Sequence, residues 1–219
     1  MRCILAAIAI LPVFALAFGS CKSSTGPATF CDTACMKDTI KFTDDKHPLK
    51  PYIYISARNC AADSLIWSYD GMGVNRKLDL ADILGTTLHL SKDFIRCTFK
   101  DTGYVWLLFN DCSSGRGYSL KIPFNKKGTI SPKASAINGL DPKYSVAEGL
   151  VAYTDRGNIF IEEMSTGKKA MMTFGQDISP NYNAIHETID SVNITPSRAW
   201  AKVKIKDEWK VLEKKIELK

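Results

Sequence analysis

The chain has 219 residues, of which 45% are hydrophobic and 24% are charged, enough for one domain with a sizeable core or for two small domains. Lysine and arginine outnumber aspartate and glutamate by 29 to 23, and the two signs are interspersed along the chain. This basic excess is too small and too dispersed for a nucleic-acid-binding surface, so we expect no nucleic-acid partner.

The chain begins with the pattern of a secretory signal peptide. Arg2 supplies a positive charge, an apolar run covers residues 4–18, and the small residues Gly19 and Ser20 follow. The apolar run is shorter than the about 20 residues that a membrane-spanning helix requires. We therefore predict that residues 1–20 are a signal peptide that directs the chain into the secretory route.

A cysteine follows this signal sequence directly. The residues Phe18-Gly19-Ser20-Cys21 resemble the lipobox of bacterial lipoproteins, although Phe18 stands where most lipoboxes have Leu, Val or Ile. The Ser-Cys-Lys-Ser-Ser sequence around the cysteine is similar to that of Bacteroidetes lipoproteins. The resemblance implies that Cys21 is lipidated, becomes the first residue of the mature protein and anchors it to an envelope membrane, with the outer membrane as the expected location.

A different cleavage site stays open. Ala15-Leu16-Ala17 fits the small-x-small pattern of ordinary signal peptidases. Cleavage after Ala17 would give a soluble periplasmic or secreted protein that begins at Phe18. Cys21 would then be an ordinary thiol.

Both routes lead to an oxidising compartment, where cysteines form structural disulfides. The first two later cysteines are separated by three residues, not the two of a redox motif, so we expect a structural bridge that holds the N-terminus of the domain. Lipidation of Cys21 leaves an odd number of cysteines, so one stays unpaired, and the pairing of the others is open. The candidate disulfide cysteines are Cys31, Cys35, Cys60, Cys97 and Cys112.

Small, polar and turn-forming residues dominate residues 22–30, which is typical of a flexible linker. We assign residues 21–36 to the lipidated N-terminus and this tether, and residues 37–219 to a single all-β domain. Apolar residues in the latter recur mostly with period two, which predicts strands. Helix is expected for at most a turn or two, at residues 79–84.

The predicted hairpins look like copies of one unit, with turn glycines at Gly103 and Gly157 in the two clearest copies. The strands of the four copies are expected at 52–57, 64–69 and 76–80; at 96–99, 104–110 and 118–124; at 150–153, 158–164 and 169–174; and at 198–206 and 209–218. The middle copies resemble the blades of TolB-like and WD40-like β-propellers, where each unit is a small antiparallel sheet. This resemblance implies a propeller-like fold of repeated antiparallel hairpins or small sheets, with a β-sandwich as the alternative.

Two tryptophans are expected to differ in burial. Residues 104–109 are apolar on both faces, which predicts a central strand covered on both sides. Trp106 in that strand is therefore expected in the core, with a buried partner for its indole N–H group. Trp67 lies next to polar Ser68 and a turn, so we expect it to be partly exposed.

No Gly-x-Ser-x-Gly elbow, His-Glu-x-x-His helix or phosphate-binding glycine loop occurs in the sequence. His47, His89 and His186 lie far apart and are interpreted as surface or core residues. We therefore expect no catalytic residue, metal or cofactor, and a non-catalytic binding or scaffold domain with an envelope protein or a glycan as partner. The alternative is an envelope or secreted hydrolase with a site of loop Asp and His residues, favoured if one histidine meets a carboxylate in an open pocket.

Overall fold

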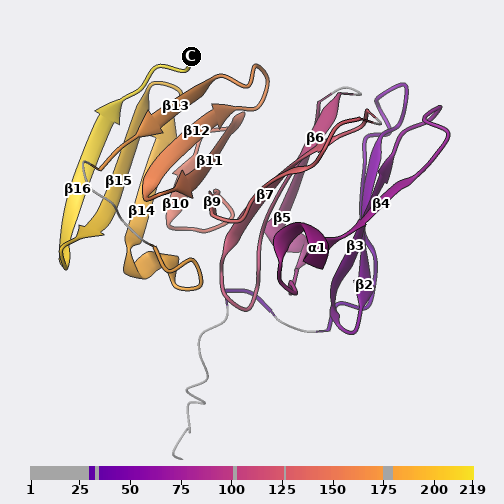
Figure 1. Cartoon of the computed structure of the whole chain (residues 1–219), viewed down its shortest axis with the longest axis horizontal. Helices are drawn as coiled ribbons and strands as arrows, with labels where there is room; N and C mark the ends of the chain where they lie inside the picture. The colour runs from indigo at the N-terminus through magenta and orange to yellow at the C-terminus, as the bar shows by residue number, and fades with distance from the viewer. Residues whose placement is uncertain (1–29, 33–34, 101–102, 126, 175–179) are drawn as a thin grey trace, which may run out of the picture.

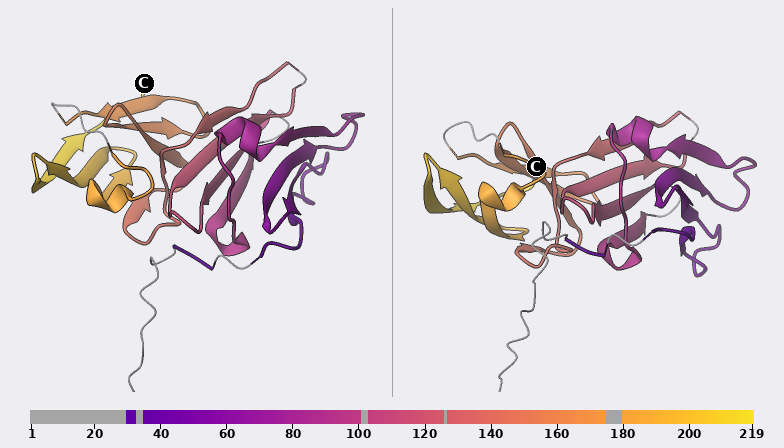
Figure 2. Two further views of the ribbon diagram at one scale, coloured as in Figure 1. Left: turned by 60° about the horizontal axis from the view of Figure 1, so that its bottom comes forward. Right: turned by 90° about the horizontal axis from the view of Figure 1, so that it is seen from below.

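The computed structural model describes residues 30–32, 35–100, 103–125, 127–174 and 180–219, and these residues confirm the predicted all-β class. Their strands form four sheets of four strands each, which are arranged in succession across the molecule (Figure 1). Figure 2 gives the same order from two other directions, with the first sheet (indigo) and the fourth (yellow) at opposite ends. Helix is limited to α1 (Leu80–Leu84) and two 3-10 turns in the described residues. No helix in these ranges is long and apolar enough to cross a membrane.

The first two sheets are antiparallel meanders of consecutive strands. The first sheet contains β1 (Ile40–Thr43), β2 (Tyr52–Arg58), β3 (Ala61–Ser68) and β4 (Arg76–Asp79). The second sheet contains β5 (Ile95–Lys100), β6 (Tyr104–Asn110), β7 (Gly117–Pro123) and β8 (Ser131–Lys133). The hairpin predicted at Gly103 joins β5 to β6, and β6 has a strand on each side, as its two apolar faces predict.

The third and fourth sheets are interleaved in sequence. The third sheet contains β9 (Ala136–Ile137), β11 (Leu150–Asp155), β12 (Asn158–Glu163) and β13 (Lys169–Met172). The fourth sheet contains β10 (Tyr144–Val146), β14 (Ile189–Thr195), β15 (Arg198–Ile205) and β16 (Glu208–Lys215). The chain therefore visits the fourth sheet at β10 before it completes the third, and β10 pairs in parallel with β14 while the other paired strands are antiparallel.

The sheets bury their apolar faces in pairs. One core lies between the first and second sheets, and a second core lies between the third and fourth sheets. In β15, for example, Ala199, Ala201, Val203 and Ile205 are buried and alternate with more exposed residues, so one face of the strand meets the core. A much smaller cluster joins the two halves. Its buried members are Trp106, Leu108, Val151 and Met164.

Both tryptophans are buried, and Trp67 is the less exposed of the two, contrary to expectation. Trp67, expected to be partly exposed, is fully buried in the first core, because its face of β3 points toward the second sheet. Its indole N–H donates to the carbonyl oxygen of Pro123 at 3.0 Å, and the guanidinium of Arg76 lies 4.8 Å from its ring centroid. Trp106 is buried as expected, but in the small joining cluster, and its Nε1 has no hydrogen-bond partner among the described residues. The expected partner for Trp106 is therefore wrong.

Two disulfides fasten the N-terminal segment to the first two sheets. Cys31 bonds to Cys112 in the β6–β7 connection, and Cys35 bonds to Cys60 in the β2–β3 turn. The paired cysteines are separated by 81 and 25 residues. Loop-closure entropy places the contributions of such cross-links to the free energy of unfolding at about 4.5 and about 3.5 kcal/mol.

Cys97, also a candidate for a disulfide, forms none within the described part of the chain. It lies in β5, and desolvation by burial raises the pKa of its thiol to about 12. The thiol therefore stays protonated at neutral pH, which makes it a poor nucleophile. The structure corrects this candidate to a half-buried, free cysteine.

The folded region begins before residue 37. The backbone N–H groups of Phe30 and Cys31 donate to the carbonyl oxygen of Cys112, and the ring of Phe30 packs edge-on against Phe94 with centroids 5.1 Å apart. Met36 is buried. Residues 30–32 and 35–36, assigned to the tether from their composition, thus belong to the domain, because disulfides and backbone hydrogen bonds hold them there. Residues 21–29 lie outside the described part of the chain.

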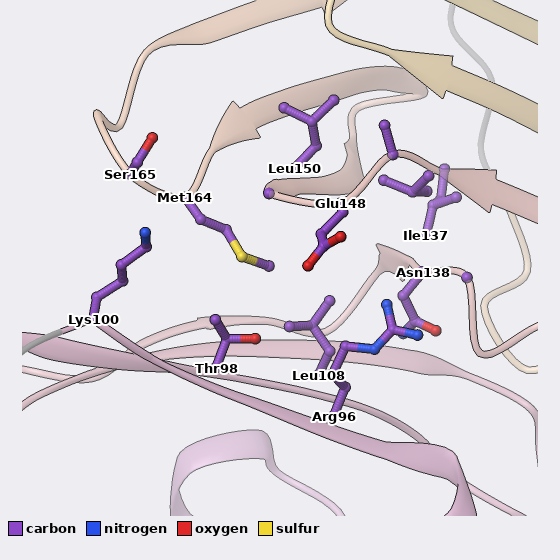
Figure 3. Close-up of a pocket in the computed structure, with 14 residues that line it drawn as sticks. Arg96, Thr98, Lys100, Leu108, Ile137, Asn138, Glu148, Leu150, Met164 and Ser165 are labelled. Atoms are coloured by element: carbon purple, nitrogen blue, oxygen red, sulfur yellow. The ribbon is translucent and has the colours of Figure 1, made fainter. Parts of the chain in front are cut away.

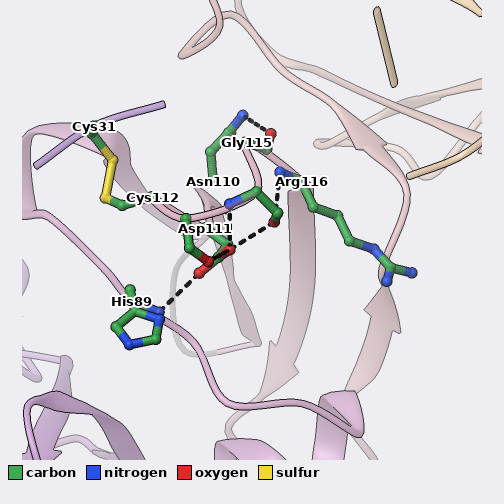
Figure 4. The surroundings of a disulfide bond; sticks show 9 residues. Cys31, His89, Asn110, Asp111, Cys112, Gly115 and Arg116 are labelled. Atoms are coloured by element: carbon green, nitrogen blue, oxygen red, sulfur yellow. Dashed lines mark hydrogen bonds between the residues drawn. A yellow bond between two sulfur atoms is a disulfide. The ribbon is translucent and has the colours of Figure 1, made fainter. Parts of the chain in front are cut away.

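Asp111 organises the β6–β7 connection beside the first disulfide (Figure 4). Its carboxylate accepts hydrogen bonds from the backbone N–H groups of His89 and Ser114, both at 2.9 Å, and from the hydroxyls of Ser113 at 2.5 Å and Ser114 at 2.6 Å. Burial acts to raise the pKa of this carboxyl group, but the hydrogen bonds outweigh it and the pKa is lowered. The Asp111 carboxylate therefore joins the segment around His89, which precedes β5, to the β6–β7 connection.

Replacing Trp67 by alanine should destabilise the protein more than replacing Trp106. Trp67→Ala removes a fully buried ring and a satisfied indole hydrogen bond, so the free energy of unfolding should fall by about 3–5 kcal/mol. Trp106→Ala should lower the free energy of unfolding by less, because its indole N–H makes no hydrogen bond among the described residues and the side chain borders a cavity. Urea denaturation of both variants tests the order. A larger loss for Trp106→Ala would mean that the junction between the halves contributes more to stability than the first core.

Candidate functional site

The junction between the second and third sheets is polar, unlike the two cores. Apolar contact there is limited to the small joining cluster, which Tyr104 also contacts. A cavity lies on each side of this cluster: one includes Leu108 and Met164 in its wall, and the other includes Trp106 and Val151. Because cavities with a few converging polar groups are the usual form of ligand sites, this junction is the first place to look for function.

The larger cavity is an open cleft of about 550 Å³ (Figure 3). Arg96, Thr98 and Lys100, at alternate positions of β5, form one wall, and the connection between β10 and β11 with the end of β12 forms the other. The glycines of the second wall expose backbone to the cleft. The lining residues are Arg96, Thr98, Lys100, Leu108, Ile137, Asn138, Gly139, Val146, Ala147, Glu148, Gly149, Leu150, Met164 and Ser165.

The charged side chains of the cleft have no ion-pair partner among the residues that the structure describes. Figure 3 shows Arg96 rising from the β5 wall and Glu148 extending from the opposite wall into the same space. Neither residue, nor Lys100, takes part in any of the ion pairs of the described residues. Two cations and one anion are therefore free to bind a ligand. The lining contains no aromatic ring.

The β5 strand also borders a second hollow. An open groove of about 510 Å³ is lined by Cys97, Thr98 and Phe99 of β5 and by residues 41–44, at and just after β1. Since β5 is the terminal strand of its sheet, one edge of its backbone has no strand partner among the described residues. That free edge therefore lies between two hollows, with Thr98 lining both.

Sequence reasoning missed Arg96, Lys100 and Glu148. One signal was present: Arg96 and Thr98 form a polar face on the strand predicted at 96–99, directly before Lys100, and the neighbouring strand is apolar on both faces. Nothing in the sequence indicated that Glu148 would lie across from them, because its place depends on how the third sheet packs against the second.

The structure places the three histidines in different connections. The backbone N–H of His47 donates to the carboxylate of Asp44 at 3.3 Å, and its Nδ1 accepts from the N–H of Leu49. His89 contacts Asp111 through its backbone, and its buried ring Nδ1 has no hydrogen-bond partner in the described ranges. No group of three or more His, Cys, Asp or Glu side chains that could hold a metal ion occurs within the described ranges.

His186 meets a carboxylate, as the hydrolase alternative requires. Its Nε2 lies 2.9 Å from the Oδ2 of buried Asp141, beside an open pocket of about 210 Å³. Its Nδ1 lies 3.3 Å from the carbonyl oxygen of Ile189, so both ring nitrogens face acceptors. The hydrogen bond to Asp141 raises the pKa of the imidazole, against the opposing effect of burial. This arrangement favours a doubly donating imidazolium that joins the β9–β10 connection to β14, with no nitrogen left to act as a base.

The contribution of His186 to stability should fall as the pH rises. A histidine whose pKa is raised in the folded state stabilises it fully below the unfolded pKa of about 6.5, and this stabilisation is lost as the pH rises through the folded-state pKa. The difference in melting temperature between the wild type and His186→Gln should therefore be larger at pH 6 than at pH 9. Asp141→Asn should remove the same dependence. A difference that stays constant or grows toward pH 9 would contradict the assignment.

Comparison with known proteins does not assign the cleft. No protein-family model, curated protein or solved structure matches this chain. The function is therefore argued from the residues of the site.

Proposed function

We propose that this protein is an envelope-anchored lipoprotein whose non-catalytic β domain binds an extended, acidic segment of another envelope protein along β5. The observation that carries the proposal is the free edge of β5 between the cleft and the open groove. The anchor rests on the lipobox resemblance of residues 18–21, which lie outside the described residues. The outer membrane is the expected location, as such a lipoprotein sequence implies.

An extended segment suits this edge for a backbone reason. A strand that adds to a sheet edge gains main-chain hydrogen bonds, and its side chains point alternately to the two faces of the sheet. Beside β5 those two faces open into the cleft and the groove. Main-chain pairing would give affinity, and the two hollows would select the side chains.

The lining of the cleft indicates the kind of segment. Arg96 and Lys100 outnumber Glu148, so an acidic side chain is favoured over a basic one. Leu108, Leu150 and Met164 add an apolar floor for a neighbouring apolar side chain. The absence of aromatic rings from the lining favours a peptide over a glycan, since binding sites for sugar rings commonly use aromatic stacking surfaces.

The architecture proposed with this function is an open, propeller-like arc of four blades. The succession of four four-stranded sheets across the molecule supports it. The pairing of the sheets around two separate cores supports the sandwich alternative for each half. Either description leaves the junction of the second and third sheets as the site.

The hydrolase alternative draws on the Asp141–His186 pair. The nearby Ser114 lines the same pocket, but its hydroxyl donates to Asp111 rather than to the imidazole. With both nitrogens of His186 facing other acceptors, general-base activation of a nucleophile would require this pair to rearrange. The binding proposal needs no such change, so we prefer it.

Charge reversal in the cleft should weaken partner binding. A photo-crosslinking amino acid at position 98 should capture one envelope protein, and mass spectrometry should locate the adduct in an extended acidic segment. A synthetic peptide of that segment should bind the protein, and Arg96→Glu with Lys100→Glu should weaken its Kd by about tenfold or more.

Lys77→Glu, at an exposed lysine of β4 outside both hollows, is the matched control and should leave the Kd unchanged. Equal binding by the wild type and the double variant would contradict the proposal. A carbohydrate adduct at position 98 would also contradict it and favour a glycan ligand.

The anchor has its own test. Cys21→Ser should abolish labelling by fatty acids and move the protein from the membrane fraction to the soluble fraction, because each buried methylene of an acyl chain contributes about 0.8 kcal/mol to membrane binding. Intact-mass analysis of the wild type should give a lipid-modified Cys21. An unmodified mature protein beginning at Phe18 would instead support cleavage after Ala17.

A further inference from the structure

The smaller cavity at the junction, of about 200 Å³, has a different chemistry from the cleft. Three lysines and one glutamate line it, which leaves an excess of two positive charges. They come from both sides of the junction: Lys121 and Lys133 from the second sheet, and Glu162 and Lys169 from the third. The remaining lining residues are Trp106, Ser131, Val151 and Tyr153.

Glu162 compensates only part of this charge. Its carboxylate is largely buried and lies 3.6 Å from the ammonium groups of both Lys121 and Lys169. Lys133 has no carboxylate within ion-pair distance in the described structure. Its ammonium group lies 4.5 Å from the ring centroid of Tyr153. Like charges held together in a cavity repel one another, so a bound anion would relieve this repulsion.

Trp106 supplies an independent observation. It lines the cavity and is 96% buried, since its exposed fraction is 4%, and its indole N–H has no acceptor among the described residues. A buried donor without an acceptor is unfavourable and calls for an explanation. The ammonium of Lys121 lies 5.3 Å from the centroid of the same indole and 4.4 Å from that of Tyr104, so the aromatic rings hold this lysine beside the donor.

We propose that this cavity binds a phosphate group, as free phosphate or as a phosphate monoester, with Lys121, Lys133 and Lys169 supplying the charge and Trp106 donating its N–H. A phosphate dianion matches the excess of two positive charges, whereas a single carboxylate matches only half of it. Lysines bind phosphate as point charges, and Ser131 adds a hydroxyl to the lining. The site shares no lining residue with the cleft beside β5, so phosphate binding can be tested independently of the proposed peptide binding.

The indole N–H resonance of Trp106 gives a direct test. In a ¹⁵N–¹H correlation spectrum of the purified protein, titration with sodium phosphate at constant ionic strength should shift one indole peak saturably. The peak is assigned by its loss in Trp106→Phe, which replaces the indole with a phenyl ring and so retains an aromatic side chain at this position. Lys133→Ala should weaken the phosphate Kd by about tenfold, because it removes one charge-assisted contact without leaving an unpaired carboxylate.

Lys77→Ala is the control, since it removes one exposed lysine of β4 outside this cavity. It should leave the phosphate Kd unchanged. Lys133→Gln repeats the test if the alanine variant does not fold. The proposal is overturned if no indole peak shifts saturably, if acetate binds as tightly as phosphate, or if both Lys133 variants bind phosphate like the wild type.

Two further titrations distinguish the source of the phosphate group. Glycerol 3-phosphate should displace inorganic phosphate if the natural ligand is a soluble ester. Vesicles of phosphatidylcholine with phosphatidic acid should bind the protein in a Lys133-dependent manner, and vesicles of phosphatidylcholine alone should not, if the ligand is a lipid headgroup. Either result supports the phosphate site.

Discussion

The pairing of sheets through their apolar faces determines the rest of this structure. A four-stranded sheet with one strongly apolar face is unstable alone and must bury that face against another layer. The first sheet does so against the second, and the third against the fourth. Once both cores are closed, the second and third sheets meet through what remains, which is a polar surface with one small apolar cluster. The interleaved order of β9 to β14 links the third and fourth sheets covalently in both directions, which reinforces their pairing.

A polar junction between the two pairs of sheets has a functional advantage. Side chains there do not need to fill space completely, so cavities persist where a core would have closed them. The same strand, β6, separates the cleft side from the lysine-lined side, because β5 and β7 flank it in the sheet. The two cavities can therefore differ in charge although they share one apolar cluster. Both depend on how the halves are positioned, so a ligand in either cavity would also stabilise that position.

The sequence predicts local structure well where a strand has a single environment. The hairpins at Gly103 and Gly157 and the strand character of β15 and β16 follow from alternation and turn residues, and the structure confirms them. The burial of Trp67 and the orphaned indole of Trp106 were not predictable, because they depend on which sheet each strand face meets. The disulfide partners of Cys31 and Cys35 and the approach of Glu148 to Arg96 are likewise long-range outcomes. Local patterns specify elements, whereas these sites arise from packing between elements distant in sequence.

The disulfides have a mechanical consequence. A pulling force applied at the N-terminus of the domain would enter at Phe30 and reach Cys31, whose covalent bond leads directly to Cys112 in the second sheet. Tension thus bypasses the whole first sheet. The Cys35–Cys60 bond closes a second loop around β1 and β2, so any force that reaches Cys35 bypasses these two strands. Strands that would otherwise be peeled away one hydrogen bond at a time are removed from the loaded path. In a protein tethered by this end, the disulfide would transmit tension directly to the β6–β7 connection, and the strands of the first sheet would lie outside the loaded path.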